Sequence, residues 1–309
     1  MKNIIASILL IVLLSILAIF PKTALHGALN GLLLWFHTVL PTLLPYMILT
    51  SLLMSYHNAH TAHGIPAELF ALLGLICGYP MGAKLCADLV KRHQITLSMG
   101  TYLLPLCNLA GPAFISGYVI YSSLKAYDSK VLCLLCIYVP LLVYALLSIL
   151  YIRPVLSSDC HALRSEAVSR PSLDQSIMDS FLAITKLGGY IILFSILSEF
   201  MILFLPQGCN LLCLCLSGAL EITNGISFIT DSTLNHSYQI VLSLTIVSFG
   251  GISCICQTNS MIKDSGLSIR YYCLSKCIIA LLTGIMAYLL FCQHVQIDSV
   301  SCSTCIGSG

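Results

Sequence analysis

Residues 69–92 read LFALLGLICGYPMGAKLCADLVKR, two apolar segments on either side of a Gly-Tyr-Pro-Met-Gly centre. Proline does not continue a regular helix, because it lacks a backbone N–H and its ring clashes with the preceding turn. At membrane depth such a break is tolerated where the freed backbone groups are buried in protein or line a cavity. The stretch therefore predicts a broken helix or a re-entrant hairpin centred on Gly78, Pro80 and Gly82.

The composition places the whole chain in a membrane. Of its 309 residues, 58% are hydrophobic and only 8% are charged, whereas roughly a quarter are charged in a soluble globular domain. One crossing of the hydrocarbon layer takes about 20 residues, so this length accommodates roughly seven to ten helical segments. A soluble fold is excluded, and we expect an all-α polytopic membrane protein.

Three further apolar segments carry similar interruptions. Residues 108–112 read NLAGP, residues 221–225 read EITNG and residues 249–251 read FGG. The second half of the chain thus repeats the order of breaks in the first half. We expect hinges or breaks at Gly78, Pro80, Gly82, Gly111, Pro112, Gly225, Gly250 and Gly251.

A polar stretch divides the chain into two halves. Residues 46–54 and 190–198 share five identities in nine positions, at an offset of 144 residues. We expect a membrane anchor helix at 1–23, a first repeat at 24–152, a cytoplasmic linker at 153–176, a second repeat at 177–292 and a short cysteine-containing tail at 293–309. Within the first repeat, the mixed polarity of residues 25–37 predicts an interfacial helix ahead of a separate span at 38–54.

The distribution of basic residues decides between two topologies. If the interrupted segments at 69–92 and 211–229 both turn back, only Lys22, Lys125 and Lys130 of the 14 Lys and Arg residues lie outside. If both segments cross, the split becomes eight against six. Because cytoplasmic loops carry an excess of Lys and Arg, we predict an inverted repeat with two re-entrant hairpins.

Broken helices at mid-membrane are where secondary transporters bind their substrates, with half-helix N-termini directed at anions. A lysine at membrane depth costs about 2.5–3.5 kcal/mol, so Lys84 indicates an anionic ligand, with Asp88 one turn away as a structural partner instead. Glu221 indicates proton or cation coupling or a substrate hydrogen bond, with a facing lysine as the alternative partner. The predicted substrate-binding residues are Tyr79, Lys84, Asn108, Glu221, Thr223, Asn224 and Gln257. Asn108, Thr223 and Asn224 could equally cap half-helices.

The sequence lacks the motifs and charge patterns of nucleic-acid binding, of a phosphate loop and of two common hydrolase classes. The net charge is +2 and no run of five basic residues occurs, so we expect no nucleic-acid partner. The lysine of GYPMGAK is followed by leucine and not by the Ser or Thr that binds magnesium in a phosphate loop. Neither a His-Glu-x-x-His nor a Gly-x-Ser-x-Gly motif occurs, so we expect no enzyme.

Metal sites and disulfides are also not expected. Most of the 16 cysteines lie inside apolar runs, where they pack as small hydrophobic residues. Cys302 and Cys305 lack the second ligand pair of a tetrahedral zinc site. His57, His60 and His63 would share one helix face, but loop histidines are more often polar surface residues. We expect no organic cofactor, and a coupling ion stays open.

Five stretches together resemble the family of the sporulation integral membrane protein YlbJ (SpoVV), which carries the nucleoside-recognition, or Gate, domain. They are LWFHTVLP at 34–41, GYPMGAK at 78–84, CNLAGP at 107–112, LEITNG at 220–225 and SFGG at 248–251. The resemblance runs from about residue 30 to 290. It implies a fold similar to concentrative nucleoside transporters, an endospore-forming source, and movement of dipicolinate toward the forespore.

The function we expect is transport of a small organic anion, and dipicolinate is the anion that the resemblance implies. Lys84 and the half-helix N-termini would suit that dicarboxylate. The alternatives are a Gate-type nucleoside or metal(II) permease and an accessory structural sporulation membrane protein. The expected partners are the anion and the lipid bilayer, with a homo-oligomer left open. The expected location is the bacterial cell membrane, as a multi-pass protein, including the outer forespore membrane during sporulation.

Overall fold

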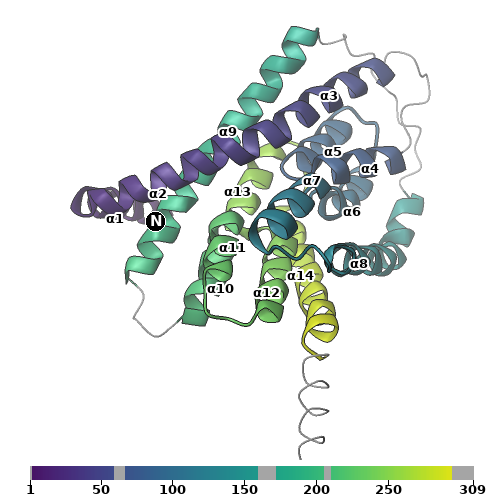
Figure 1. Cartoon of the computed structure of the whole chain (residues 1–309). Coiled ribbons are helices and arrows are strands. Elements are labelled where there is room, and N and C mark those ends of the chain that lie inside the picture. Colours follow the sequence, from purple (N-terminus) through teal and green to yellow (C-terminus); the bar gives the residue numbers. More distant parts are fainter. Residues whose placement is uncertain (1, 59–66, 159–171, 205–209, 294–309) are drawn as a thin grey trace, which may run out of the picture.

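The computed structural model describes residues 2–58, 67–158, 172–204 and 210–293, and all regular structure in these ranges is helical (Figure 1). The elements up to the long loop are α1 (Lys2–Ile19), α2 (Pro21–Leu34), η1 (Trp35–Val39), α3 (Leu40–Asn58), α4 (Ala67–Cys77), α5 (Met81–Lys91), α6 (Leu97–Cys107), α7 (Pro112–Phe114), η2 (Ile115–Ser123) and α8 (Lys130–Ser158). The second half contains α9 (Leu173–Phe204), α10 (Asn210–Leu220), α11 (Ile222–Thr230), α12 (His236–Phe249), α13 (Gly251–Met261) and α14 (Ile269–Phe291).

Six helices in the described ranges are long and apolar enough to cross a membrane. They are Pro21–Leu53, Leu97–Ser123, Lys130–Leu150, Leu173–Phe204, His236–Met261 and Ile269–Phe291. This confirms the prediction of an all-α polytopic membrane protein. The boundaries predicted for the repeats stay a prediction, and most of the predicted linker at 153–176 lies outside the described residues.

The first long helix differs from its sequence-based interpretation. Residues 25–37 and 38–54, expected as an interfacial helix and a separate span, form one continuous helix through η1. The η1 segment is a π-helical turn in which the Leu40 amide bonds to the Trp35 carbonyl. The hydroxyl of Thr42 donates to the Thr38 carbonyl at 2.6 Å, which satisfies an acceptor beside Pro41. The helix therefore continues through Pro41 and Pro45.

Two glycines hold this helix against α9. A Cβ added at Gly27 would lie 2.8 Å from the Ile196 Cα, and one added at Gly31 would lie 2.8 Å from the Ile192 Cα. Glycines four residues apart let two membrane helices approach at backbone distance. Figure 1 shows the continuous helix of α2 and α3 crossing α9.

The described helices are interrupted at four places that bear on the site. The helix ends lie at 77–81 between α4 and α5, at 107–112 between α6 and α7, at 220–222 between α10 and α11, and at 249–251 between α12 and α13. Gly225 packs directly on the backbone of Gly218 across the third break. In a straight helix these residues would lie about 10 Å apart. The chain therefore folds back at Glu221, and α11 lies against α10.

One pocket bears on the membrane topology. A polar pocket of about 570 Å³ is lined by residues from the end of η2, the end of α11 and the start of α12, including Lys125 and Asp231. A topology in which both interrupted segments cross would place Lys125 and Asp231 on opposite faces of the membrane. Their shared pocket argues against that topology and is consistent with two segments that turn back. The inverted repeat itself stays a prediction.

Labelling from outside the cell tests this topology. Cysteines introduced as Arg92→Cys and Asp231→Cys should lie on opposite faces, with only the second reached by a membrane-impermeant maleimide in intact cells. The measurement is peptide-resolved mass spectrometry before and after permeabilisation, which separates the introduced thiols from the native ones. Equal labelling of both positions in intact cells would contradict the two re-entrant hairpins.

Candidate functional site

A cavity lies where the helix breaks converge. Tyr79 reaches it from the break before α5, Glu221 and Thr223 from the start of α11, and Cys254 and Gln257 from α13. The rest of its lining consists of Val39, Thr42, Leu43, Gly111, Phe114, Leu187, Ile191 and Ile222. Four of the predicted site residues (Tyr79, Glu221, Thr223, Gln257) thus share one cavity.

The cavity is small in this conformation. Its volume is about 40 Å³, and one water molecule takes roughly 10–15 Å³ on the same measure. It therefore has room for a few waters and none for a ring-containing dicarboxylate. A larger solute would enter only after the surrounding helices move apart.

Glu221 is bound to the start of its own helix. Its side chain is 5% exposed, and its Oε2 accepts hydrogen bonds from the Asn224 backbone N–H at 2.9 Å and from the Thr223 hydroxyl. A carboxylate at this position satisfies first-turn amides and interacts favourably with the positive end of the helix dipole. The N-terminus of α11 is therefore already occupied by an anionic group of the protein.

The polar groups on the other side of the cavity make fewer hydrogen bonds within the protein. Gln257 is 2% exposed and donates from Nε2 to the Ser253 hydroxyl at 3.0 Å. Its Oε1 is buried and has no hydrogen-bond partner among the described residues. The hydroxyl of Tyr79 lies beside the Cys254 thiol. An unused amide oxygen and a phenol with only a weak sulfur partner are groups that a polar solute can engage.

Asn108 does not line the cavity, and its side chain instead hydrogen-bonds residues on both sides of the breaks at 77–81 and 107–112. Its Oδ1 accepts from the Ala83 backbone N–H at 3.2 Å, in the first turn of α5. Its Nδ2 donates to the Thr258 hydroxyl at 2.7 Å and to the Tyr272 hydroxyl at 2.9 Å. This fully buried side chain thus joins the first-half break to α13 and α14.

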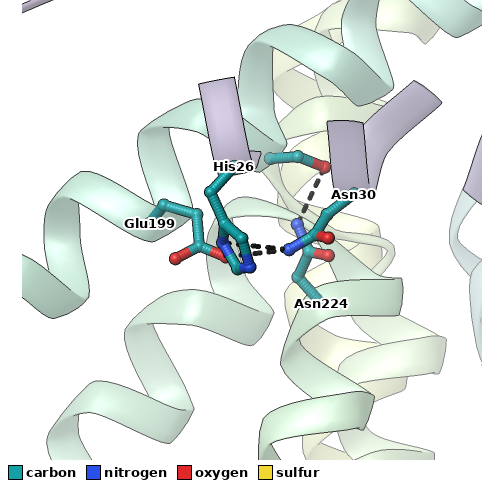
Figure 2. Close-up of polar contacts among 5 residues, drawn as sticks. His26, Asn30, Glu199 and Asn224 are labelled. Atoms are coloured by element: carbon teal, nitrogen blue, oxygen red, sulfur yellow. Dashed lines mark hydrogen bonds and ion pairs between the residues drawn. The ribbon is translucent and has the colours of Figure 1, made fainter. Parts of the chain in front are cut away.

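Lys84 and Asn224 also lie away from the cavity lining. Lys84 is half-buried in the first turn of α5, and among the described residues its side chain makes no hydrogen bond or ion pair, including with Asp88. Burial raises the pKa of the Asp88 carboxyl, and the charge of Lys84 acts against that rise. Asn224 directs its amide to the Ser195 hydroxyl of α9 at 2.8 Å (Figure 2). Substrate contact by these two residues stays a prediction.

A second polar cluster joins α2 and α9 near that bond (Figure 2). The Oε1 of Glu199 lies 3.1 Å from the Nδ1 of His26 and accepts from the Nδ2 of Asn30 at 3.1 Å. Gly31 packs on α9 one residue beyond Asn30, so the cluster lies where the two helices approach most closely. A carboxylate within an apolar helix pair is thereby provided with partners.

Comparison with known proteins gives one informative match. No family model matches the chain, and no solved structure matches it. The sporulation integral membrane protein YlbJ of Bacillus subtilis (strain 168) is 23% identical over 88% of this chain and 78% of its own length. The chain is similar to this protein along most of its length. It is an integral membrane protein, in agreement with the six candidate spans in its described residues.

Three residues that bear on the site were not among the predicted site residues. Cys254 and Phe114 line the cavity, but in the sequence each is an ordinary apolar residue of a hydrophobic run. Lys276 in α14 is fully buried, although its place near the start of an apolar run suggested a cytoplasmic charge. The polar Tyr272 and Ser275, which lie on the same side of α14, were the available sign that Lys276 faces protein.

A metal ion requires several ligating side chains close together. The described residues contain no group of three or more His, Cys, Asp or Glu side chains placed to hold a metal ion. The histidine set considered from the sequence is only partly covered, since His60, His63 and the side chain of His57 lie outside the described residues. The same holds for Cys302 and Cys305.

Replacement of Asn108 tests whether its hydrogen bonds stabilise the contact between the helix breaks. Asn108→Ala removes three buried hydrogen bonds and leaves the Ala83 amide without an acceptor, so the free energy of unfolding should fall by about 1–3 kcal/mol. Thermal unfolding of the detergent-purified protein measures the change. Asn259→Ala is the matched control, because the Asn259 side chain is exposed on α13 and has no hydrogen-bond partner among the described residues. Equal stability of the two variants would contradict this assignment.

Proposed function

We propose that this protein is a secondary transporter that moves a small organic anion by alternating access. The observation that carries the proposal is the cavity between the helix breaks, lined by Tyr79, Glu221, Thr223 and Gln257. Substrate sites built from discontinuous helices near the bilayer midplane are a common feature of secondary transporters. A protein whose breaks served only to pack helices would have no need of polar groups aimed into shared space.

A thin aromatic barrier closes the cavity on one side. Phe114 lines the cavity, whereas Tyr118, one turn later, lines the large polar pocket between η2, α11 and α12. The two rings stack with their centroids 5.2 Å apart. The Tyr118 hydroxyl donates to the Thr223 carbonyl at 3.1 Å. Movement of this pair would join the two spaces, which is the step that alternating access requires.

The similarity to YlbJ supports a sporulation role, and the resemblance implies dipicolinate as the anion. A sporulation membrane protein with a closed polar cavity is consistent with export of a small solute from the mother cell across the outer forespore membrane. Dipicolinate carries two carboxylates on a rigid ring, so its transport requires a positive group close to the cavity. The driving force would come from a coupled ion, for which Glu221 is the candidate site.

A nucleoside is the second candidate substrate, and the cavity lining favours it in one respect. None of the lining residues is a cation, whereas Glu221, Thr223 and Gln257 are groups that hydrogen-bond hydroxyls and base edges. A fold similar to concentrative nucleoside transporters would agree with that chemistry. Competition between the two solute classes decides between them.

Uptake into proteoliposomes tests the proposal directly. Purified protein should accumulate labelled dipicolinate, and excess unlabelled dipicolinate should compete while nucleosides and iron(II) should not. Competition by nucleosides would favour the second candidate, and absence of uptake of any of these solutes would contradict a transport role.

Glu221→Gln should lower the uptake rate roughly 10- to 100-fold, because loss of a charged hydrogen-bonding group costs about 1.5–3 kcal/mol. The variant keeps an amide oxygen that can still cap α11, so its abundance in the membrane should be normal. Glu199→Gln makes the same change in the cluster between α2 and α9 and should leave the rate near that of the unmodified protein. Unchanged uptake in Glu221→Gln would rule out its role in the carrier.

The aromatic barrier makes a separate prediction. Tyr118→Phe removes a hydrogen bond worth about 1 kcal/mol, which should raise the population of the opened barrier about fivefold. The rate at which a small methanethiosulfonate reagent modifies Cys254, followed by peptide mass spectrometry, measures that opening. Tyr127→Phe is the control, because the exposed Tyr127 packs on Tyr121 away from the cavity. A Cys254 rate that does not change would show that Tyr118 does not close the cavity.

A further inference from the structure

Lys276 is the most unusual charged residue in the described part of the chain. It lies in α14 with 0% exposure, and its Nζ has no hydrogen-bond partner among the described residues. The one ion pair found in those residues joins His26 to Glu199 and does not involve Lys276. A buried ammonium group is strongly unfavourable unless an opposite charge or several acceptors compensate it. The described side chains provide no such compensation in this conformation.

The N-terminus of α13 is also unusual among the half-helices. The first turn of α5 has an acceptor in Asn108, and the first turn of α11 has one in Glu221. The N-cap of α13 is Gly250, which provides no side-chain hydrogen bond. A helix start carries roughly half a positive elementary charge on its free amides. No described side chain caps this helix start, and the groups beside Gly251 are backbone carbonyls at the end of α10.

These two positive groups lie together. The Cε of Lys276 is 3.6 Å from the position that a Cβ would take at Gly250, so the end of the lysine side chain reaches the N-cap of α13. Its charge also acts on Cys254, one turn into α13. Cys254 lines the cavity. The lysine and the helix start therefore lie directly behind one wall of the candidate substrate cavity.

We propose that Lys276 and the N-terminus of α13 bind a carboxylate of the transported anion. The inference rests on the proposed function and adds the positively charged residue that an anionic substrate requires. Glu221 does not fill this role, because its carboxylate is held by Thr223 and Asn224 at another helix start. An incoming carboxylate would reach the lysine once the helices around Cys254 move apart, and it would compensate both positive groups at once.

Three substitutions separate this role from a structural one. Lys276→Met removes the charge at similar length, Lys276→Arg retains it, and Lys186→Met makes the first change at an exposed position on α9. Binding of dipicolinate, picolinate and uncharged picolinamide to the detergent-purified protein is measured by calorimetry and by the shift in melting temperature. The unmodified protein should bind the two carboxylates and not the amide.

The expected loss in Lys276→Met is roughly 10- to 100-fold in carboxylate affinity, the usual effect of removing a charge-assisted hydrogen bond. Lys276→Arg should retain binding, and Lys186→Met should bind as the unmodified protein does. The ligand-free melting temperature gives a second readout. It should rise in Lys276→Met, because an uncompensated buried charge is replaced by an apolar side chain.

The outcomes distinguish the two proposals. Carboxylate binding by the unmodified protein supports the organic-anion function, and its absence overturns both that function and the site. Equal binding by the unmodified protein and Lys276→Met overturns the role of Lys276 alone. A Lys276→Met protein that melts earlier or does not fold also overturns that role, since it would show that the lysine holds the structure together.

Discussion

Backbone contact between broken helix ends is the constraint on which the rest of this structure depends. A Cβ at Gly82 would overlap the Cys107 carbonyl, and Gly225 packs on the backbone of Gly218. Only glycine permits approaches this close. Because free backbone groups are costly away from water, bringing the breaks together lets polar groups from one half satisfy the helix ends of the other. The cavity is the space left over where four such ends meet.

The backbone amides at the helix starts beside these breaks are bonded in different ways, and the differences bear on the proposed function. Asn108 provides a neutral acceptor from a neighbouring helix, and Glu221 provides a charged one from its own helix. The start of α13 has a lysine where the others have an acceptor. No described side chain caps the start of α13, where the carbonyls at the end of α10 lie beside Gly251. In the proposed anion site, an incoming carboxylate would take the place that a side-chain acceptor fills at the other two helix starts.

The sequence predicted the helical membrane fold and drew attention to the segments that surround the cavity. Proline, glycine and polar residues in apolar runs are strong local signals, because their effect on a helix depends on few neighbours. The orientation of side chains was harder to predict. Lys84 and Lys276 look alike in the sequence, yet one lies half-buried beside Asp88 and the other is enclosed behind Cys254. That difference depends on how each helix is rotated in the bundle, which short motifs do not encode.

The π-helical turn at 35–39 lies between two contact faces of one helix. A single inserted residue rotates everything beyond it by about 100° around the helix axis. The face that carries Gly27 and Gly31 therefore pairs with α9, and the face that carries Val39, Thr42 and Leu43 forms the cavity wall and also packs on α9. The Trp35 indole, which donates to the Ile184 carbonyl at 2.9 Å, fixes the turn in place. Because Val39 and Leu43 pack in one cluster with Leu187 and Ile191 of α9, a substitution along the wall changes both the space available to a solute and the helix pair that supports it.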